Sequence, residues 1–287
     1  MAWYDKYLAA FDCSYQDVSV EIKEEVAFKL AKFHSQDMPL CSVVLIAHNE
    51  ERHILGCLWS LVDNICNFPV EIIVVSNNST DATEQILKEV GAIWYNEEKK
   101  GPGYARQCGL NYARGKFHIC IDSDTLYPPY YIATHINYLK ETDIVCTYGF
   151  WSFLPDAKHS GVSLFFYELF RDVYLFFQNM NRPELCVRGM TLAFHTELGK
   201  KIGYRTNILR GEDGMMALKL KQYGKLKLII SRKVRPMTCS NTLDGGGSLI
   251  KNLCSRLKKG LRNIRLLFTK QKEYEDKDYN LIKKHEG

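Results

Sequence analysis

The chain has 287 residues, of which 46% are hydrophobic and 25% are charged, so its composition is that of a globular protein and not of a disordered chain. No run of about 18 uncharged apolar residues occurs, which excludes a conventional membrane-spanning helix. The net charge of +5 is local, because residues 251–272 contain eight Lys and Arg residues and no acid, which leaves 5 − 8 = −3 for the remainder.

Ten cysteines are spread along the chain, without a Cys-x-x-Cys pair or a Cys/His cluster at zinc-finger spacing. We therefore expect reduced thiols packed in the core of a cytoplasmic protein. The first residues, MAWYDKYLAAFDCSYQ, lack the basic start and apolar stretch of a signal peptide. These features predict a protein that is either free in the cytoplasm or peripheral on the inner face of the membrane.

The chain is predicted to begin with an amphipathic helix over residues 17–34, where Ile22, Val26, Leu30 and Phe33 recur on one helical face. From residue 41 onward, apolar runs rich in β-branched residues alternate with helical patterns. The predicted strands are 41–48, 70–76, 91–96 and 116–122, and the predicted helices are 50–66, 81–90 and 103–115. This alternation predicts an α/β fold with a mostly parallel sheet, whose polar strand ends share the edge where such sheets bind ligands.

The pattern is less regular after Pro129. It predicts a strand over 144–153, an aromatic-rich helix over 161–180, a loop entering a strand over 187–195, a turn and helix over 208–224, and a last strand over 225–231. The aromatic helix is expected to be buried or to line an acceptor groove, with lipid contact as the alternative, because its three charges and its length argue against a membrane span. The glycine-rich segment DGGGS at 244–248 is predicted to be a hinge.

The basic segment 249–272 follows the hinge. Leu253, Leu257, Leu261, Ile264 and Phe268 recur at helical spacing, with the basic residues on the other side. A helix that packs on the body by its apolar stripe is the favoured interpretation. An anionic membrane surface is the alternative partner, and nucleic acid is the least favoured one. We therefore divide the chain into a helical extension (1–38), a main domain (39–240, with halves 39–129 and 130–240), and a hinge with a basic amphipathic helix (241–287).

Two carboxylates end the fourth predicted strand, in the motif Asp122-Ser123-Asp124. Acids at the end of a buried strand need a cationic partner, and paired carboxylates suit a hard divalent cation that also binds a diphosphate. A solvated turn is the alternative. The position beside three other polar strand ends favours a metal site.

Polar residues also follow the first two strands, as Ala47-His48-Asn49-Glu50 and as Ser76 to Asp81. In the second segment, Ser79 or Thr80 could instead cap the following helix. Gly101 and Arg106 open the third helix, whose N-terminus can hold phosphate oxygens. The segment does not fit the Walker A pattern, and no Gly-x-Gly-x-x-Gly follows the first strand, which argues against NTPase and dinucleotide sites.

A second acidic pair, Glu212-Asp213, opens a predicted helix between two glycines. The negative charges of this pair would interact favourably with the positive N-terminal end of the helix dipole, so a capping role is one explanation. The other is a general base, which needs an ionised carboxylate within reach of the attacking group.

With these segments in order, the chain resembles the family 2 glycosyltransferases of the nucleotide-sugar-dependent GT-A fold over roughly residues 41–235. The resemblance is carried by VVLIAHNEE, IIVVSNNSTDAT, GPGYARQCGLNYARG, IDSDT and RGEDGMMALKLKQYG. The last segment is similar to the family's Glu-Asp pair, whose Asp is the catalytic base. The resemblance implies an inverting, metal-dependent transferase.

Residue by residue, the resemblance implies the following roles. It places His48, Asn49, Glu50 and Asn77 in the nucleoside pocket, Asp122 at the ribose or the metal, Asp124 on Mn²⁺ or Mg²⁺, Asp213 as the base, and Glu212 as an orienting group. Arg188, Gly189, Met190 and Thr191 are the candidates for the acceptor-side loop. The expected partners are a nucleotide-sugar donor, with a UDP-sugar favoured, and a hydroxyl acceptor that could be lipid-linked.

Two departures from the family pattern matter. Members usually have an acid where Asn77 stands; its carbonyl can still accept from a uracil N3–H, while its amide group could meet a different base. The Gln-x-x-Arg-Trp motif of processive synthases is missing, so we expect single sugar additions. A nucleotidyltransferase would need a glycine-rich basic loop after the first strand, which AHNEERH does not provide. A non-catalytic membrane-peripheral module is the other alternative, and the presence of all three acids weighs against it.

Overall fold

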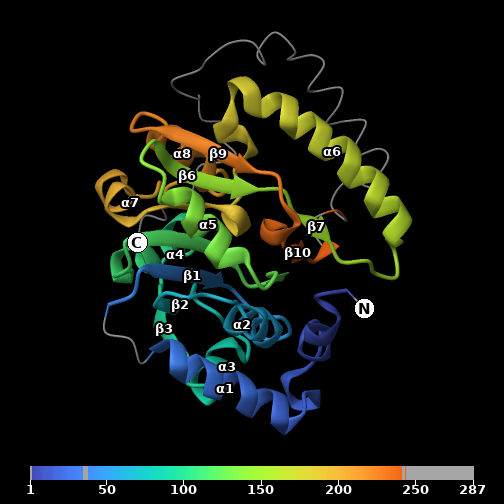
Figure 1. Ribbon diagram of the computed structural model, residues 1–287. Helices are drawn as coiled ribbons and strands as arrows, with labels where there is room; N and C mark the ends of the chain where they lie inside the picture. The colour runs from blue at the N-terminus through green and yellow to red at the C-terminus, as the bar shows by residue number, and fades with distance from the viewer. Residues whose placement is uncertain (1, 35–37, 241–242, 244–287) are drawn as a thin grey trace.

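A computed structural model describes residues 2–34, 38–240 and 243. The main sheet has seven strands in the order β3-β2-β1-β4-β8-β6-β9 (Figure 1). Their bounds are β1 Cys41–Ala47, β2 Val70–Ser76, β3 Ile93–Asn96, β4 Phe117–Asp122, β6 Ile144–Gly149, β8 Ala193–His195 and β9 Lys225–Ile229. Only β8 runs antiparallel to its neighbours, so the sheet is mostly parallel, as the sequence predicts.

Eight helices flank the sheet in the described part of the chain. They are α1 Val20–His34, α2 Ile54–Val62, α3 Thr83–Glu89, α4 Pro102–Tyr112, α5 Tyr131–Leu139, α6 Gly161–Asn181, α7 Thr196–Ile202 and α8 Glu212–Leu220. Short 3-10 turns are η1 Asp5–Ala10, η2 Tyr15–Asp17, η3 Pro183–Cys186, η4 Gly189–Thr191 and η5 Arg232–Val234. No helix among the described residues is long and apolar enough to cross a bilayer.

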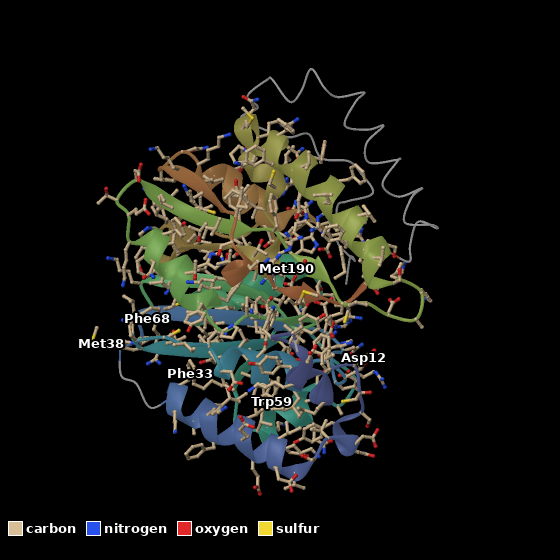
Figure 2. All side chains as sticks on the ribbon, turned by 45° about the vertical axis from the view of Figure 1, so that its right-hand side comes forward. Asp12, Phe33, Met38, Trp59, Phe68 and Met190 are labelled. Atoms are coloured by element: carbon tan, nitrogen blue, oxygen red, sulfur yellow. The ribbon has the colours of Figure 1, made fainter. Side chains whose placement is uncertain are left out.

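Residues on opposite faces of the sheet belong to different core clusters, because successive strand residues point to opposite sides. In β1, Val43 and Leu45 join the core beneath α1, α2, α3 and α5, while Val44 faces α4. Figure 2 shows Trp59 of α2 inside the first of these cores. A second core lies between the sheet and helices α6 and α8.

Several boundaries differ from the sequence prediction. The strand expected over 144–153 is divided into β6 and a short β7 (Ser152–Phe153), and the one expected to be last is followed by β10 (Met237–Thr238). β10 lies between β7 and β5 (Thr125–Leu126) in a small second sheet. Helices α5 and α7 were not predicted.

The N-terminal extension is packed into the main domain. Tyr7, Val26 and Leu30 are buried in the same core as β1 and β4. The segment predicted as a separate hinge and basic helix, 241–287, lies outside the described residues except for Leu243. The membrane interpretation of 249–272 stays a prediction for the same reason.

Strand register explains where the site forms. Ala47 at the end of β1 pairs with Ser76 at the end of β2, and Ile46 pairs with Asp122 at the end of β4. The polar residues that follow these strands therefore emerge at one edge of the sheet, as the sequence predicts.

Candidate active site

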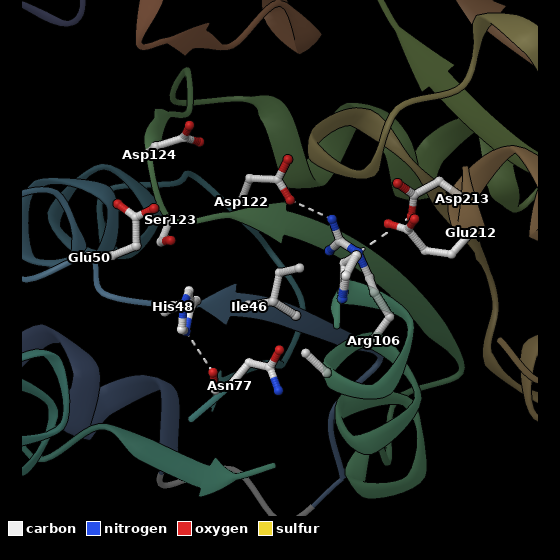
Figure 3. A pocket seen from close by; sticks show the side chains of 13 residues that line it. Ile46, His48, Glu50, Asn77, Arg106, Asp122, Ser123, Asp124, Glu212 and Asp213 are labelled. Carbon is white, nitrogen blue, oxygen red and sulfur yellow. Dashed lines mark hydrogen bonds and ion pairs between the residues drawn. The ribbon is translucent and has the colours of Figure 1, made fainter. Parts of the chain in front are cut away.

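A pocket of about 270 Å³ opens at this edge of the sheet (Figure 3). Ten predicted site residues line it: Ala47, His48, Glu50, Asn77, Arg106, Asp122, Ser123, Asp124, Glu212 and Asp213. Three more lining residues were not predicted: Ile46, Pro102 and Ala105. Small-molecule sites typically measure about 300–1,000 Å³, so a whole nucleotide sugar would extend beyond this pocket.

Arg106 joins the two acidic motifs. Its side chain is only 2% exposed; its guanidinium donates to a carboxylate oxygen of Asp122 and, at 3.1 Å, to the carbonyl of Ile121. Its Nε lies 3.4 Å from Oδ1 of Asp213, so the same cation contacts both motifs. The charge of Arg106 is directed at these two carboxylates, and the expectation that Arg106 holds phosphate oxygens stays a prediction.

The predicted acceptor-side residues lie next to this ion pair without lining the pocket. A Cβ at Gly189 would be 2.0 Å from Nη2 of Arg106 and 2.7 Å from Oδ2 of Asp213, so only glycine fits there. The carbonyl of Met190, labelled in Figure 2, accepts a 2.8 Å hydrogen bond from Tyr131. Thr191 is buried in the same turn and donates to the carbonyl of Arg188 at 3.3 Å. Arg188 lies over the ring of Trp151.

Asp124 is a carboxyl group in an unfavourable electrostatic environment. Burial, followed by repulsion from Asp122 and Glu50, raises the pKa of Asp124 to about 7. Its own hydrogen bond within the site, from Thr125 at 3.1 Å, is too little to offset this. A cation bound at Asp124 would remove the repulsion.

The turn after β1 is fixed by the loop after β2. Asn49 has a left-handed backbone conformation (φ 57°). Its side-chain Oδ1 accepts a hydrogen bond from the backbone N–H of Thr80 at 2.7 Å, and its backbone N–H donates to the hydroxyl of Ser79 at 3.2 Å. Ser79 and Thr80 therefore do not cap α3. Asp81 accepts from the Thr83 amide at the start of that helix instead. Asn49 positions the turn from outside the pocket.

Asn77 is the buried link between β2 and the loop before α4. Its amide group donates to the carbonyls of Glu97 and Lys99 at 2.9 and 2.8 Å, and its Oδ1 accepts from the Gly101 amide at 2.9 Å. Its backbone carbonyl lies 2.8 Å from Nδ1 of His48. Both amide hydrogens are thus used within the protein and neither is available to a base. Gly101 precedes α4 with φ 135°, a conformation that favours glycine.

Changing Asn77 to Asp is expected to lower both stability and nucleotide affinity. A carboxylate would lose both donated hydrogen bonds and face two carbonyl oxygens, and a buried unsatisfied group costs about 1–3 kcal/mol. Thermal unfolding at pH 7 and UDP titration would measure the two effects. Tighter UDP binding with an unchanged melting temperature would instead mean that residue 77 reads the base directly.

Glu212 and Asp213 share the first turn of α8 and affect each other's ionisation. Burial and the neighbouring Asp213 raise the pKa of Glu212 to about 8. Burial also raises the pKa of Asp213, while Arg106 and a hydrogen bond from Glu212 act in the opposite direction. The arrangement favours a protonated Glu212 beside an ionised Asp213. Asp213 is the member of the pair that can accept a proton.

This assignment predicts a pH-dependent effect of Glu212→Gln. The folded protein holds the Glu212 proton up to pH about 8, whereas the unfolded chain releases it near pH 4.5, so this group's contribution to stability falls as the pH rises between those values. Glutamine cannot ionise. The melting temperature of the variant relative to wild type should therefore increase from pH 5 to pH 8, and a pH-independent difference would contradict the assignment.

Tyr127 is a positioning residue that the sequence did not reveal. Its hydroxyl accepts from the Asp122 amide at 3.0 Å, and its own amide donates to Ser60 of α2 at 3.1 Å. The ring is fully buried. Tyr127 therefore fixes the backbone of the acidic motif from behind the pocket.

The mostly parallel sheet flanked by helices is that of the GT-A fold glycosyltransferases. Among solved structures, the fold is similar to a mannosyltransferase, PcManGT from Pyrobaculum calidifontis in complex with GDP-Man and Mn²⁺ (TM-score 0.54, 18% identity, covering 83% of this chain and 69% of that one). It is also similar to S. aureus TarS in complex with UDP (TM-score 0.53, 21% identity, covering 69% and 60%).

The family model for glycosyl transferase family 2 matches residues 42–200. Curated relatives include uncharacterized glycosyltransferases from Methanocaldococcus jannaschii (25% identity, covering 62% of this chain and 63% of that protein) and from Haemophilus influenzae (27% identity, covering 41% and 49%). The matched region therefore spans less than two thirds of each relative's length. The chain belongs to glycosyl transferase family 2.

Proposed function

We propose that the protein transfers a single sugar from a nucleotide-diphosphate sugar, with a UDP-sugar favoured, to a hydroxyl group of an acceptor. The observation that carries the proposal is the buried ion-pair chain Asp122–Arg106–Asp213, which brings the Asp-x-Asp motif and the candidate base into one pocket. The structural neighbours, in complex with UDP or GDP-Man, support a nucleotide-sugar donor.

The donor set suits a divalent cation. Asp124 and Asp122 provide two carboxylates, and Mg²⁺ or Mn²⁺ commonly binds one or two protein carboxylates together with substrate phosphates and water. Among the residues that the structure describes, no three His, Cys, Asp or Glu side chains lie close enough together to hold a metal ion by themselves. The diphosphate of the donor would therefore complete the coordination. A bound cation would offset the charge that builds on the leaving diphosphate.

Asp213 would take the proton of the attacking hydroxyl. Burial raises the pKa of Asp213 toward the working pH of a general base, and Arg106 opposes this rise by favouring the ionised form. Direct displacement by that hydroxyl inverts the anomeric centre, so an α-linked donor gives a β-linked product. Gly189 leaves the space in which the acceptor loop can pack against this base.

Incubation with radiolabelled UDP-glucose, UDP-GlcNAc, UDP-galactose and GDP-mannose tests the proposal. We expect slow, metal-stimulated hydrolysis of one UDP-sugar without acceptor, and faster turnover with a hydroxyl acceptor, lipid-linked acceptors included in the panel. Preference for GDP-mannose would overturn the donor assignment. Release of pyrophosphate from a nucleoside triphosphate and a sugar phosphate would indicate a nucleotidyltransferase, and binding without turnover would indicate a non-catalytic module.

A further inference from the structure

Helix α6 has an exposed apolar face. Nine of its large apolar side chains are exposed: Val162, Phe165, Phe166, Leu169, Phe170, Val173, Phe176, Phe177 and Met180. The expectation of a buried helix holds only for the opposite face, where Leu164, Tyr167 and Leu175 join the second core. An apolar surface of this extent on one element marks an interaction site.

The charges of α6 are all directed away from this face. Glu168 and Asp172 pair with Arg235 at 3.0 and 2.7 Å, and Arg171 is buried against Asp172 at 2.8 Å. Glu168 also accepts from the Phe153 amide at 2.7 Å. The helix is therefore fixed to the body by its inner side, and nothing charged on it opposes an apolar partner on its outer side.

The exposed residues are spaced for pairing with another helix. Val162, Phe166, Leu169, Val173, Phe176 and Met180 follow at intervals of 4, 3, 4, 3 and 4 residues. An alternation of three and four is the seam of helices that pack side by side over several turns. At about 1.5 Å per residue, this seam is about 27 Å long.

The chain leaves the described domain beside this helix. Ser240 donates to the carboxylate of Asp156, just before the start of α6, and Leu243 is buried in the same core as Leu164. Residues 244–248 include three glycines and can span about 17 Å. Residues 249 onward therefore begin within reach of α6.

The sequence beyond that point carries a matching stripe. Ile250, Leu253, Leu257, Leu261, Ile264 and Phe268 follow at intervals of 3, 4, 4, 3 and 4 residues. As a helix, this stripe would be about 27 Å long, the length of the α6 seam. If this helix docks on the outer face of α6, the eight basic residues of 251–272 would meet no like charge from α6 and would stay in solvent.

We propose that the outer face of α6 is the docking surface for residues 249–272 of the same chain. The similar spacing of three and four residues, the equal length of about 27 Å and the point of departure at Leu243 carry the proposal. It is independent of the proposed function, because no residue of the pocket takes part.

Hydrogen–deuterium exchange of the full chain in lipid-free buffer tests this proposal. Amides of 253–268 should exchange at least about 10-fold more slowly than in an unstructured peptide. The double variant Phe166→Glu/Phe176→Glu should abolish that protection while α6 itself stays protected by its inner face. Phe28→Glu is the matched control: Phe28 is 63% exposed on α1, which lies at the opposite end of the molecule from α6, so the protection should be unchanged (Figure 1).

The tail variant Leu257→Glu/Ile264→Glu leaves the described domain untouched, so it gives an answer even if the α6 variant does not fold. It should abolish the same protection and increase binding of an apolar dye to the exposed α6 face. Unprotected 253–268 in the wild type would overturn the proposal. So would protection of 253–268 that appears only with anionic phosphatidylglycerol vesicles or only in a dimer, because the segment would then bind lipid or a second copy of the chain.

Discussion

Changing Asp213 to Asn is expected to slow sugar transfer by about 10²- to 10⁴-fold, the usual contribution of a general base. Asparagine keeps the size and polarity of the side chain but takes no proton at neutral pH. Arg106 would still be held by Asp122 and by the Ile121 carbonyl. Nucleotide affinity should therefore stay within a few-fold of wild type, as measured by calorimetry alongside single-turnover transfer.

Glu212→Gln provides the matched control at the neighbouring position. The pKa of Glu212, raised to about 8, keeps this group protonated at neutral pH, and glutamine reproduces a protonated carboxyl that can donate to Asp213. This variant should transfer sugar far faster than Asp213→Asn. If Asp213→Asn transfers at close to the wild-type rate with unchanged thermal stability, the acidic pair serves the helix terminus and not the reaction.

The sheet could be predicted because its central strands are buried on both faces. Mostly apolar runs in β1, β2 and β4, separated by helical patterns, predict a parallel arrangement. Helix α5 was missed since its buried face includes His135, which forms a 2.8 Å hydrogen bond with Thr147 and breaks the apolar periodicity. β10 contains only two residues, too few for any pattern.

The strand-end residues of the site could also be predicted, because the carboxyl ends of parallel strands meet at one edge. The partners of each side chain could not. Residue spacing does not show that Arg106 contacts Asp122 and Asp213, which come from β4 and α8. Asn77 was expected to face a base, yet its amide hydrogens bind the backbone of the loop before α4. Both cases depend on side-chain direction in a region where several elements converge, which residue spacing does not encode.

Changing Asp124 to Asn is expected to abolish metal-dependent nucleotide binding. The site would lose the carboxylate whose charge is disfavoured by burial and by Asp122 and Glu50, and which a bound cation would stabilise. UDP affinity should then be the same with and without Mn²⁺, whereas in the wild type Mn²⁺ should strengthen it. Asp143→Asn is the matched control, since Asp143 is an exposed acid paired with Lys225 and distant in the sheet from the pocket. Its Mn²⁺ dependence should equal that of the wild type.

Because the pKa of Asp124 is raised to about 7, both metal binding and stability are expected to depend on pH. Below pH 7 a proton competes with the cation, so Mn²⁺ affinity of the wild type should rise with pH, by up to about tenfold per unit, and level off above pH 7. Without metal, ionisation of Asp124 beside Asp122 and Glu50 destabilises the fold as the pH rises from about 4 to 7, so Asp124→Asn should melt at a higher temperature than wild type at pH 8. Added Mn²⁺ should raise the melting temperature of the wild type but not of the variant. A variant that is less stable without metal and still responds to Mn²⁺ would show that Asp124 is a structural acid and that the cation binds elsewhere.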